Sequence, residues 1–79
     1  MTQRTVKIYT QPGCGACMNA KEYLKSKGVA FEELDITTSD SAFEELTQKY
    51  QGRGTPTIVI GEVVIQGFNR DRLEEALAA

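Results

Sequence analysis

The sequence predicts one α/β domain whose elements follow the order βαβαββα, with helices packed on a mixed sheet of four strands. Two patterns lead to this prediction. In the first half of the chain, strand-type apolar runs alternate with helical patterns, so the first two strands should pair in parallel. In the second half, two β-branched runs lie only two residues apart, which is typical of an antiparallel hairpin. Because 79 residues can enclose only one hydrophobic core, we expect residues 1–79 to form a single domain.

The first predicted strand covers residues 5–10. Val6 and Ile8 lie on one of its faces, and Lys7 and Tyr9 lie on the other. A proline and a glycine then follow, and neither residue type continues a strand readily. The chain should therefore turn before the first helix begins.

The next elements are a helix over residues 15–27 and a strand over residues 29–36. Apolar residues in the helix recur at helical spacing, and Gly28 follows them as a C-terminal cap. The strand carries a few apolar side chains among acidic ones, so its alternation is imperfect.

A second helix should begin within residues 37–41, where several side chains can act as an N-cap. Ser41 and Glu44 have the spacing of a capping box. The buried stripe of this helix is expected to consist of Phe43, Leu46 and Tyr50.

The hairpin joins strands over residues 57–60 and 63–65. Gly61 occupies the first position of the two-residue link, which suits a type II′ turn. Asn69 can then cap the last helix. The apolar stripe of that helix is expected to consist of Leu73, Ala76 and Leu77.

Composition argues against several classes of function. Two cysteines and no histidine cannot form a closed zinc site within one chain or a Cys-His catalytic pair. The formal net charge of −2 argues against nucleic-acid binding. No run is long and apolar enough to span a membrane, and the first residues lack the apolar core of a signal peptide. We therefore expect a cytoplasmic protein, and in that compartment a C-x-x-C motif is more often catalytic than structural.

The two cysteines, Cys14 and Cys17, lie at the junction between the first strand and the first helix. Unpaired N–H groups and the positive end of the helix dipole favour a thiolate there, so Cys14 is the expected nucleophile. Cys17 lies one turn further along, within reach of a disulfide. A purely stabilising disulfide is the alternative, but it would close too small a loop to add much stability. The spacing therefore indicates a reversible redox pair.

Two further dipeptides, Thr55-Pro56 and Gly67-Phe68, complete a pattern that resembles a known family. Together with the C-x-x-C motif, they make nearly the whole chain similar to the thioredoxin-fold redoxins of the glutaredoxin type. Residues 66–71 are also similar to the tail of the NrdH-redoxins, which donate electrons to a class of ribonucleotide reductase. The resemblance implies the thioredoxin-like (glutaredoxin) fold and a monomeric dithiol-disulfide oxidoreductase that reduces protein disulfides. Ribonucleotide reductase is one such target, and the redox-active disulfide is the only redox group implied.

The resemblance also implies the residues of the site. Cys14 and Cys17 would be catalytic, and no residue would bind a metal. Pro56 would follow a cis peptide bond, and Thr55 would offer its backbone groups to an extended substrate. The substrate-binding patch would consist of Gly13, Gly15, Ala16, Thr55, Pro56, Gly67 and Phe68.

The expected electron donor follows from two departures from the family pattern. Members that use glutathione commonly carry a Gly-Gly pair and then an aspartate that grips the tripeptide. At the matching places this chain has Gln66-Gly67 and then Asn69. We therefore expect thioredoxin reductase to recycle the disulfide. A glutathione-dependent glutaredoxin is the alternative.

A different class of function is a carrier of soft metal ions. The small copper chaperones also place a C-x-x-C motif after a first strand, and paired thiolates suit Cu(I). Those proteins end in a strand, whereas this chain is predicted to end in a helix, and they have no use for Thr55-Pro56. A third possibility is an iron–sulfur scaffold shared by two chains with glutathione, which the weak glutathione determinants make less favoured.

Overall fold

The computed structural model describes residues 5–52 and 54–78. Residues 1–4, in which we expect no signal peptide, lie outside the described residues, as do Arg53 and Ala79. The order of the elements is the predicted βαβαββα, except that the second helix continues into a π-helical turn. The elements are β1 (Val6–Thr10), α1 (Gly15–Ser26), β2 (Glu32–Asp35), α2 (Asp40–Glu44), the π-helical turn η1 (Glu45–Lys49), β3 (Thr57–Ile60), β4 (Val63–Gln66) and α3 (Arg70–Ala78).

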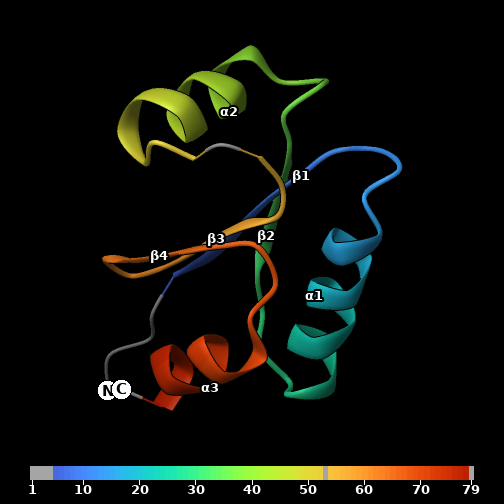
Figure 1. Ribbon diagram of the computed structural model, residues 1–79, viewed down its shortest axis with the longest axis vertical. Coiled ribbons are helices and arrows are strands. Elements are labelled where there is room, and N and C mark those ends of the chain that lie inside the picture. Colours follow the sequence, from blue (N-terminus) through green and yellow to red (C-terminus); the bar gives the residue numbers. More distant parts are fainter. Residues whose placement is uncertain (1–4, 53, 79) are drawn as a thin grey trace.

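The four strands form one mixed sheet in the order β2-β1-β3-β4 (Figure 1). β1 pairs in parallel with β2, as the alternation of strands and helices predicts. β3 is antiparallel to both β1 and β4, which confirms the predicted hairpin. β3 is buried along its whole length, as expected for a central strand, whereas the edge strand β2 is shorter than the predicted residues 29–36.

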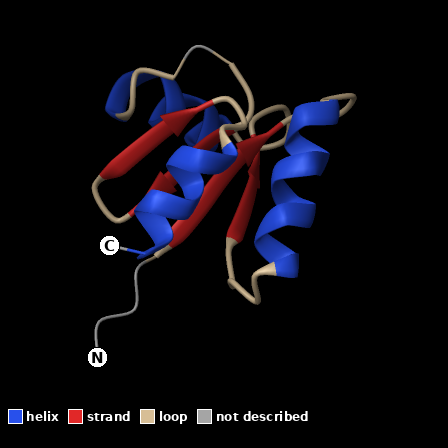
Figure 2. Cartoon of the chain, turned by 60° about the horizontal axis from the view of Figure 1, so that its bottom comes forward, coloured by secondary structure: helices blue, strands red, loops and turns tan. Residues whose placement is uncertain are grey.

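Helices cover both faces of the sheet (Figures 1 and 2). The core under α1 and α3 consists of Val6, Ile8, Ala20, Leu24, Ile58, Ile60, Ile65, Leu73 and Ala76. The smaller core under α2 and η1 consists of Tyr9, Ala42, Leu46 and Val59. Tyr9 is therefore fully buried, because α2 covers the face of β1 on which it lies.

The caps of the first two helices differ in how well the sequence predicts them. Gly28 follows α1 with a φ of +69°, and its N–H donates to the carbonyl of Lys25 across 3.0 Å. This confirms the predicted C-terminal cap. The predicted capping box at Ser41 is wrong, since the N-cap of α2 is Ser39, whose hydroxyl accepts the N–H of Ala42 across 3.2 Å. The side chain of an N-cap residue accepts the N–H of a residue two or three positions later. The N-cap is therefore Ser39, two residues before the expected Ser41.

Phe43 does not join the buried stripe that the sequence predicts for the second helix. Its side chain is 52% exposed, and Ala42 and Leu46 face the sheet instead. The α-helix ends at Glu44 and continues as the π-helical turn over Glu45–Lys49. Each turn of a π-helix holds more residues than a turn of an α-helix, so the regular spacing that we assumed does not apply.

Two connections flank β3, the Gly61 turn after it and the Thr55-Pro56 segment before it. Gly61 in the β3–β4 link has a φ of +61° while Glu62 does not take a positive φ, as a type II′ turn requires. The Thr55-Pro56 peptide bond is cis, as the family resemblance implies. The N–H of Gly67 donates to the carbonyl of Pro56 across 2.8 Å. This hydrogen bond holds the segment after β4 against the segment before β3.

Candidate active site

Cys14 occupies the N-cap position of α1. Its backbone is extended, with φ −94° and ψ 102°, and its Sγ accepts a hydrogen bond from the N–H of Cys17 across 3.1 Å. A donor from the first turn and the positive end of the helix dipole both stabilise negative charge on that sulfur. The sulfur that the sequence predicts to be nucleophilic thus lies at the helix N-terminus.

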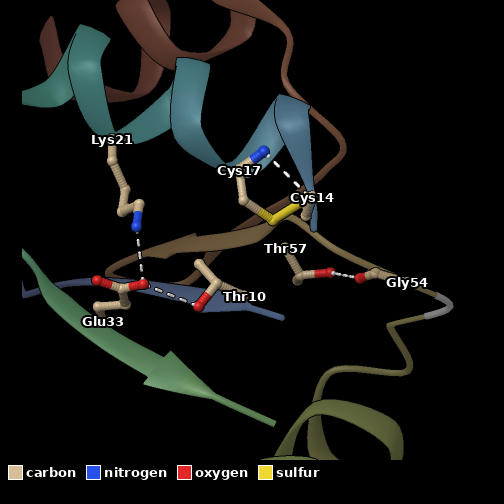
Figure 3. The surroundings of a disulfide bond; sticks show 7 residues. All are labelled: Thr10, Cys14, Cys17, Lys21, Glu33, Gly54 and Thr57. Carbon is tan, nitrogen blue, oxygen red and sulfur yellow. Dashed lines mark hydrogen bonds and ion pairs between the residues drawn. A yellow bond between two sulfur atoms is a disulfide. The ribbon is translucent and has the colours of Figure 1, made fainter. Parts of the chain in front are cut away.

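Cys14 and Cys17 are joined by a disulfide bond, and their Cα atoms are 5.2 Å apart (Figure 3). Only 2% of the surface of Cys17 is exposed, whereas Cys14 is partly exposed. Because thiol–disulfide exchange requires direct approach of one sulfur to another, an external partner can reach Cys14 more readily than Cys17. The geometry therefore distinguishes an outer sulfur from an inner one.

A cavity of about 280 Å³ lies beside the disulfide. It is bounded by the end of β1, the loop that follows, the first two turns of α1 and the strand β2. Its lining residues are Thr10, Gln11, Pro12, Gly13, Cys14, Cys17, Met18, Lys21, Glu33 and Asp35.

Three side chains from three elements form a hydrogen-bonded network in this cavity (Figure 3). The carboxylate of Glu33 on β2 accepts a hydrogen bond from Nζ of Lys21 on α1 across 2.9 Å. The same oxygen accepts the hydroxyl of Thr10 on β1 across 3.0 Å. The bond from Lys21 lowers the pKa of Glu33 most, against the opposing effect of burial, and the bond from Thr10 adds to the lowering. The carboxylate of Glu33 is therefore ionised at neutral pH.

Lys21 and Glu33 are not among the site residues that the sequence predicts. One available signal is that Lys21 follows Cys17 by four positions and so shares its face of α1. The other is the parallel pairing of the first two strands, which places Asp35 opposite Thr10 and Glu33 two residues before it on the same face. Neither signal alone indicates that these residues lie near the thiols. Together they place the charges of Lys21 and Glu33 beside the N-terminal turns of α1.

Six of the seven predicted substrate-binding residues fall into two groups. The group at the start of α1, all exposed, consists of Gly13, Gly15 and Ala16. The second group is the cis Thr55-Pro56 pair with Gly67, which the hydrogen bond from Gly67 to Pro56 holds together. Figure 3 shows both neighbours of that pair, Gly54 and Thr57, in the surroundings of the disulfide, joined by a hydrogen bond of 2.8 Å. The Oγ1 atom of Thr55 is buried without a hydrogen-bond partner among the described residues.

Phe68 lies in a neighbouring groove and not in the cavity beside the disulfide. Its ring packs on Tyr23, with the ring centroids 6.0 Å apart, and against the core under α1 and α3. The groove has a volume of about 670 Å³ and is lined by Met18, Asn19, Glu22, Tyr23, Ser26, Phe68 and Arg70. Met18 is 63% exposed and lines both the groove and the cavity, so it connects the two.

The described residues contain neither a cluster of metal ligands nor a membrane-spanning helix. Within residues 5–52 and 54–78, no group of three or more His, Cys, Asp or Glu side chains could hold a metal ion. None of the helices described is long and apolar enough to cross a membrane. The last described element is the helix α3, in contrast to the final strand of the copper chaperones.

A family model described as Glutaredoxin matches residues 6–65, which is most of the chain. The chain belongs to the glutaredoxin family. Members of this family are generally thiol-disulfide oxidoreductases, and the Cys14-Cys17 pair makes this chain a thiol redox protein of the glutaredoxin family. The matched range includes both cysteines, Thr55 and Pro56, and it ends before Gly67.

Individual proteins similar to this glutaredoxin-family chain support the same assignment. A glutaredoxin-like 8.6 kDa protein of Clostridium pasteurianum is 33% identical over 72 residues, covering 91% of this chain and 96% of that protein. The crystal structure of the thioredoxin-like protein BC3987 is 38% identical, with a TM-score of 0.90 over 92% of this chain and 100% of that one. NrdH-redoxin from Escherichia coli is 28% identical, with a TM-score of 0.80 over 90% of this chain and 92% of that one. That protein is described as glutaredoxin-like with a thioredoxin-like activity profile.

Proposed function

We propose that this protein is a dithiol-disulfide oxidoreductase that reduces protein disulfides through Cys14 and Cys17. The observation that carries the proposal is the position of the two sulfurs: Cys14 accepts a hydrogen bond at the N-terminus of α1, and Cys17 is buried behind it. A sulfur stabilised as a thiolate and open to a partner is suited to attack. A second sulfur within bonding distance of the first is suited to complete the exchange.

The reaction has two displacements. The thiolate of Cys14 attacks one sulfur of the target disulfide, which forms a mixed disulfide and releases the other target sulfur as a thiolate. Cys17 then loses its proton and attacks Sγ of Cys14, which breaks the mixed disulfide and releases the second target thiolate. Two electrons have passed to the target, whose sulfurs take up two protons. The protein is left with the Cys14-Cys17 disulfide.

The residues around the dithiol are proposed to bind the polypeptide that carries the target disulfide. Gly13, Gly15 and Ala16 have small or absent side chains at the approach to Cys14, which leaves room for a partner backbone. Thr55 and Pro56 are proposed to present backbone groups to that segment, supported by the hydrogen bond from Gly67. Phe68 would contribute from the adjoining groove.

We infer that thioredoxin reductase, and not glutathione, recycles the disulfide. The side-chain oxygen of Asn69 accepts the N–H of Arg72 across 3.1 Å, so Asn69 caps α3 as predicted and offers no charge to a tripeptide. Gln66 ends β4 where a glycine would allow closer backbone approach. The thioredoxin-like activity profile of the similar NrdH-redoxin supports the same choice. We further propose that residues 1–79 act as a cytoplasmic, monomeric single domain and that ribonucleotide reductase is a candidate target.

A coupled assay tests this proposal. The oxidised protein is offered NADPH with thioredoxin reductase, or NADPH with glutathione and glutathione reductase, and turnover is followed on a protein disulfide. We expect the first system to be faster. Efficient reduction by glutathione together with no reaction with thioredoxin reductase would assign the protein to the glutathione-dependent glutaredoxins instead.

A double variant supplies the matched comparison. Gln66→Gly with Asn69→Asp restores a glycine and a carboxylate, and a charge-assisted hydrogen bond to the tripeptide is worth roughly 1.5–3 kcal/mol. The affinity for glutathione should therefore rise about ten- to a hundredfold. Because aspartate also caps helices well, α3 should remain stable in this variant.

A further inference from the structure

The cavity beside the disulfide carries a net negative charge. One ammonium group, that of Lys21 on α1, faces the two carboxylates of Glu33 and Asp35 on β2, which gives a net charge of −1. The lining residues from β1, from the loop after it and from the rest of α1 are uncharged. Cys14 and Cys17 line the α1 side of this negatively charged cavity.

These charges persist at neutral pH. The pKa of Glu33 is lowered chiefly by the hydrogen bond from Lys21. The pKa of Asp35 is lowered chiefly by the hydroxyl of Thr37, which donates to the carboxylate across 2.6 Å. Neither carboxylate takes up a proton in the range where thiols titrate, so each acts as a fixed charge.

The two sulfurs experience different surroundings. Cys14 is stabilised as a thiolate by the first turn of α1, whereas Cys17 is buried and lines the negative cavity. Burial and nearby negative charge both favour the neutral form of a thiol. We propose that the carboxylates of Glu33 and Asp35 keep Cys17 protonated in the reduced protein and that Lys21 limits this effect. This inference rests on the proposed exchange reaction. In it, Glu33, Asp35 and Lys21 do not react; they set when Cys17 loses its proton.

The order of steps follows from the charges. While Cys14 is a thiolate, a second thiolate at Cys17 would add another like charge, so Cys17 keeps its proton. Formation of the mixed disulfide removes the charge of Cys14 and lowers the pKa of Cys17. Cys17 then releases its proton to solvent, and its thiolate attacks Sγ of Cys14 and expels the target thiolate. The cavity thus delays the second nucleophile until the first has reacted.

The test is a titration of the reduced full-length protein, with the 13Cβ resonances of both cysteines followed by NMR. The two thiols titrate as a coupled pair, so the second macroscopic pKa is the quantity compared. Glu33→Gln keeps an oxygen that accepts from Thr10 and Lys21 but removes the charge, and it should lower that pKa by about half a unit. Lys21→Met removes the opposite charge and should raise it by about as much.

The opposite signs separate a charge effect from a structural one. Both substitutions remove the same ion pair, so a merely structural role would move the second pKa in the same direction or not at all, and either result overturns the proposal. Glu32→Gln is the matched control, because Glu32 is exposed and lies on the α2 face of β2 together with Leu34. A shift from Glu32→Gln as large as that from Glu33→Gln would also overturn it.

The parent protein provides a measurement that needs no variant. Raising the salt concentration from about 0.01 M to 1 M shortens the Debye length from about 30 Å to 3 Å, so the second pKa should fall as the carboxylates are screened. A pKa that does not change with salt contradicts the proposal. These titrations do not require disulfide reductase activity, so the proposal and the proposed function can fail separately.

Discussion

The backbone N–H of Cys17 donates a hydrogen bond to Sγ of Cys14 across 3.1 Å. The donor belongs to the first turn of α1, and the acceptor belongs to the residue that caps it. The backbone of Cys17 therefore stabilises negative charge on the sulfur of Cys14 before any thiol–disulfide exchange takes place. This dependence leads to two predictions about the dithiol.

Cys14 should react first with an alkylating reagent. Its sulfur lies at the helix N-terminus, which lowers the pKa of a thiol, whereas Cys17 is buried. The reduced protein is treated with iodoacetamide at about pH 6, and the modified residue is located by peptide mass mapping. Labelling of Cys17 before Cys14 would reverse the assigned roles.

Cys14→Ser should abolish reduction of a protein disulfide, whereas Cys17→Ser should retain the first displacement and accumulate a mixed disulfide with the target. The second displacement in Cys17→Ser lacks its nucleophile. Non-reducing electrophoresis after incubation with a disulfide-bonded protein detects the adduct. Equal loss in both variants without an adduct would contradict the two-step exchange.

Met18→Ala should weaken the use of protein substrates. Met18 is 63% exposed where the dithiol cavity meets the groove of Phe68, so a polypeptide bound to Cys14 should cover it. We expect KM for a protein disulfide to rise about fivefold with little change in kcat, which corresponds to about 1 kcal/mol. Phe43→Ala is the control, since Phe43 is 52% exposed on the helix that covers the other face of the sheet. An equal effect from Phe43→Ala would show that exposed apolar area matters and its location does not.

Tyr9→Phe should lower the stability of the protein in a pH-dependent way. The hydroxyl of Tyr9 donates to Glu45, and this bond lowers the pKa of Glu45 most, with Lys7 adding to it and burial opposing it. A carboxyl whose pKa is lowered by folding adds stability above its unfolded pKa of about 4.3 and loses it as the pH falls through the folded value. Tyr9→Phe should therefore be about 1 kcal/mol less stable than the parent at pH 7, and the difference should shrink below about pH 4.

Urea unfolding at several pH values measures this difference. Tyr50→Phe is the matched control, because the rings of Tyr50 and Tyr9 lie 5.9 Å apart and the Tyr50 hydroxyl has no hydrogen-bond partner among the described residues. A difference for Tyr9→Phe that is the same at pH 3 and pH 7 would contradict the role given to Glu45.

Ser39→Ala should cost about 1 kcal/mol of unfolding free energy, because it removes the N-cap of α2. Ser41→Ala should cost much less, since Ser41 is exposed and already within the helix. Thermal or urea unfolding of the two variants distinguishes them. The reverse order would favour the capping box expected from the sequence.

Local patterns in the sequence predict most of the fold. The change from strand to helical spacing around Cys14, the left-handed cap at Gly28 and the hairpin link at Gly61 each depend on residues close together in the chain. The parallel pairing of β1 and β2 follows from the order of the elements alone. The family resemblance adds the cis bond before Pro56, which no local pattern specifies.

The features that the sequence does not predict depend on contacts between distant residues. Lys21 and Glu33 are twelve positions apart. Their ion pair forms only because α1 packs against the sheet with Lys21 next to Glu33 on β2. The burial of Tyr9 depends on α2 and η1, which begin at Asp40 and Glu45, far along the chain from Tyr9. Phe43 is exposed because α2 packs on the sheet with the face that carries Ala42. In each case the tertiary arrangement, and not the local pattern, determines the environment of the side chain.

The two edges of the sheet differ in their chemistry. β2 at one edge carries Glu32, Glu33 and Asp35, and charged side chains make an edge strand a poor template for another strand. β4 at the other edge is uncharged, and Val63 and Val64 are partly exposed. Self-association by strand addition, in concentrated solution or in a destabilised variant, should therefore begin at β4. The two acids that set the charge of the dithiol cavity, Glu33 and Asp35, thus also make this edge of the sheet a poor site for aggregation.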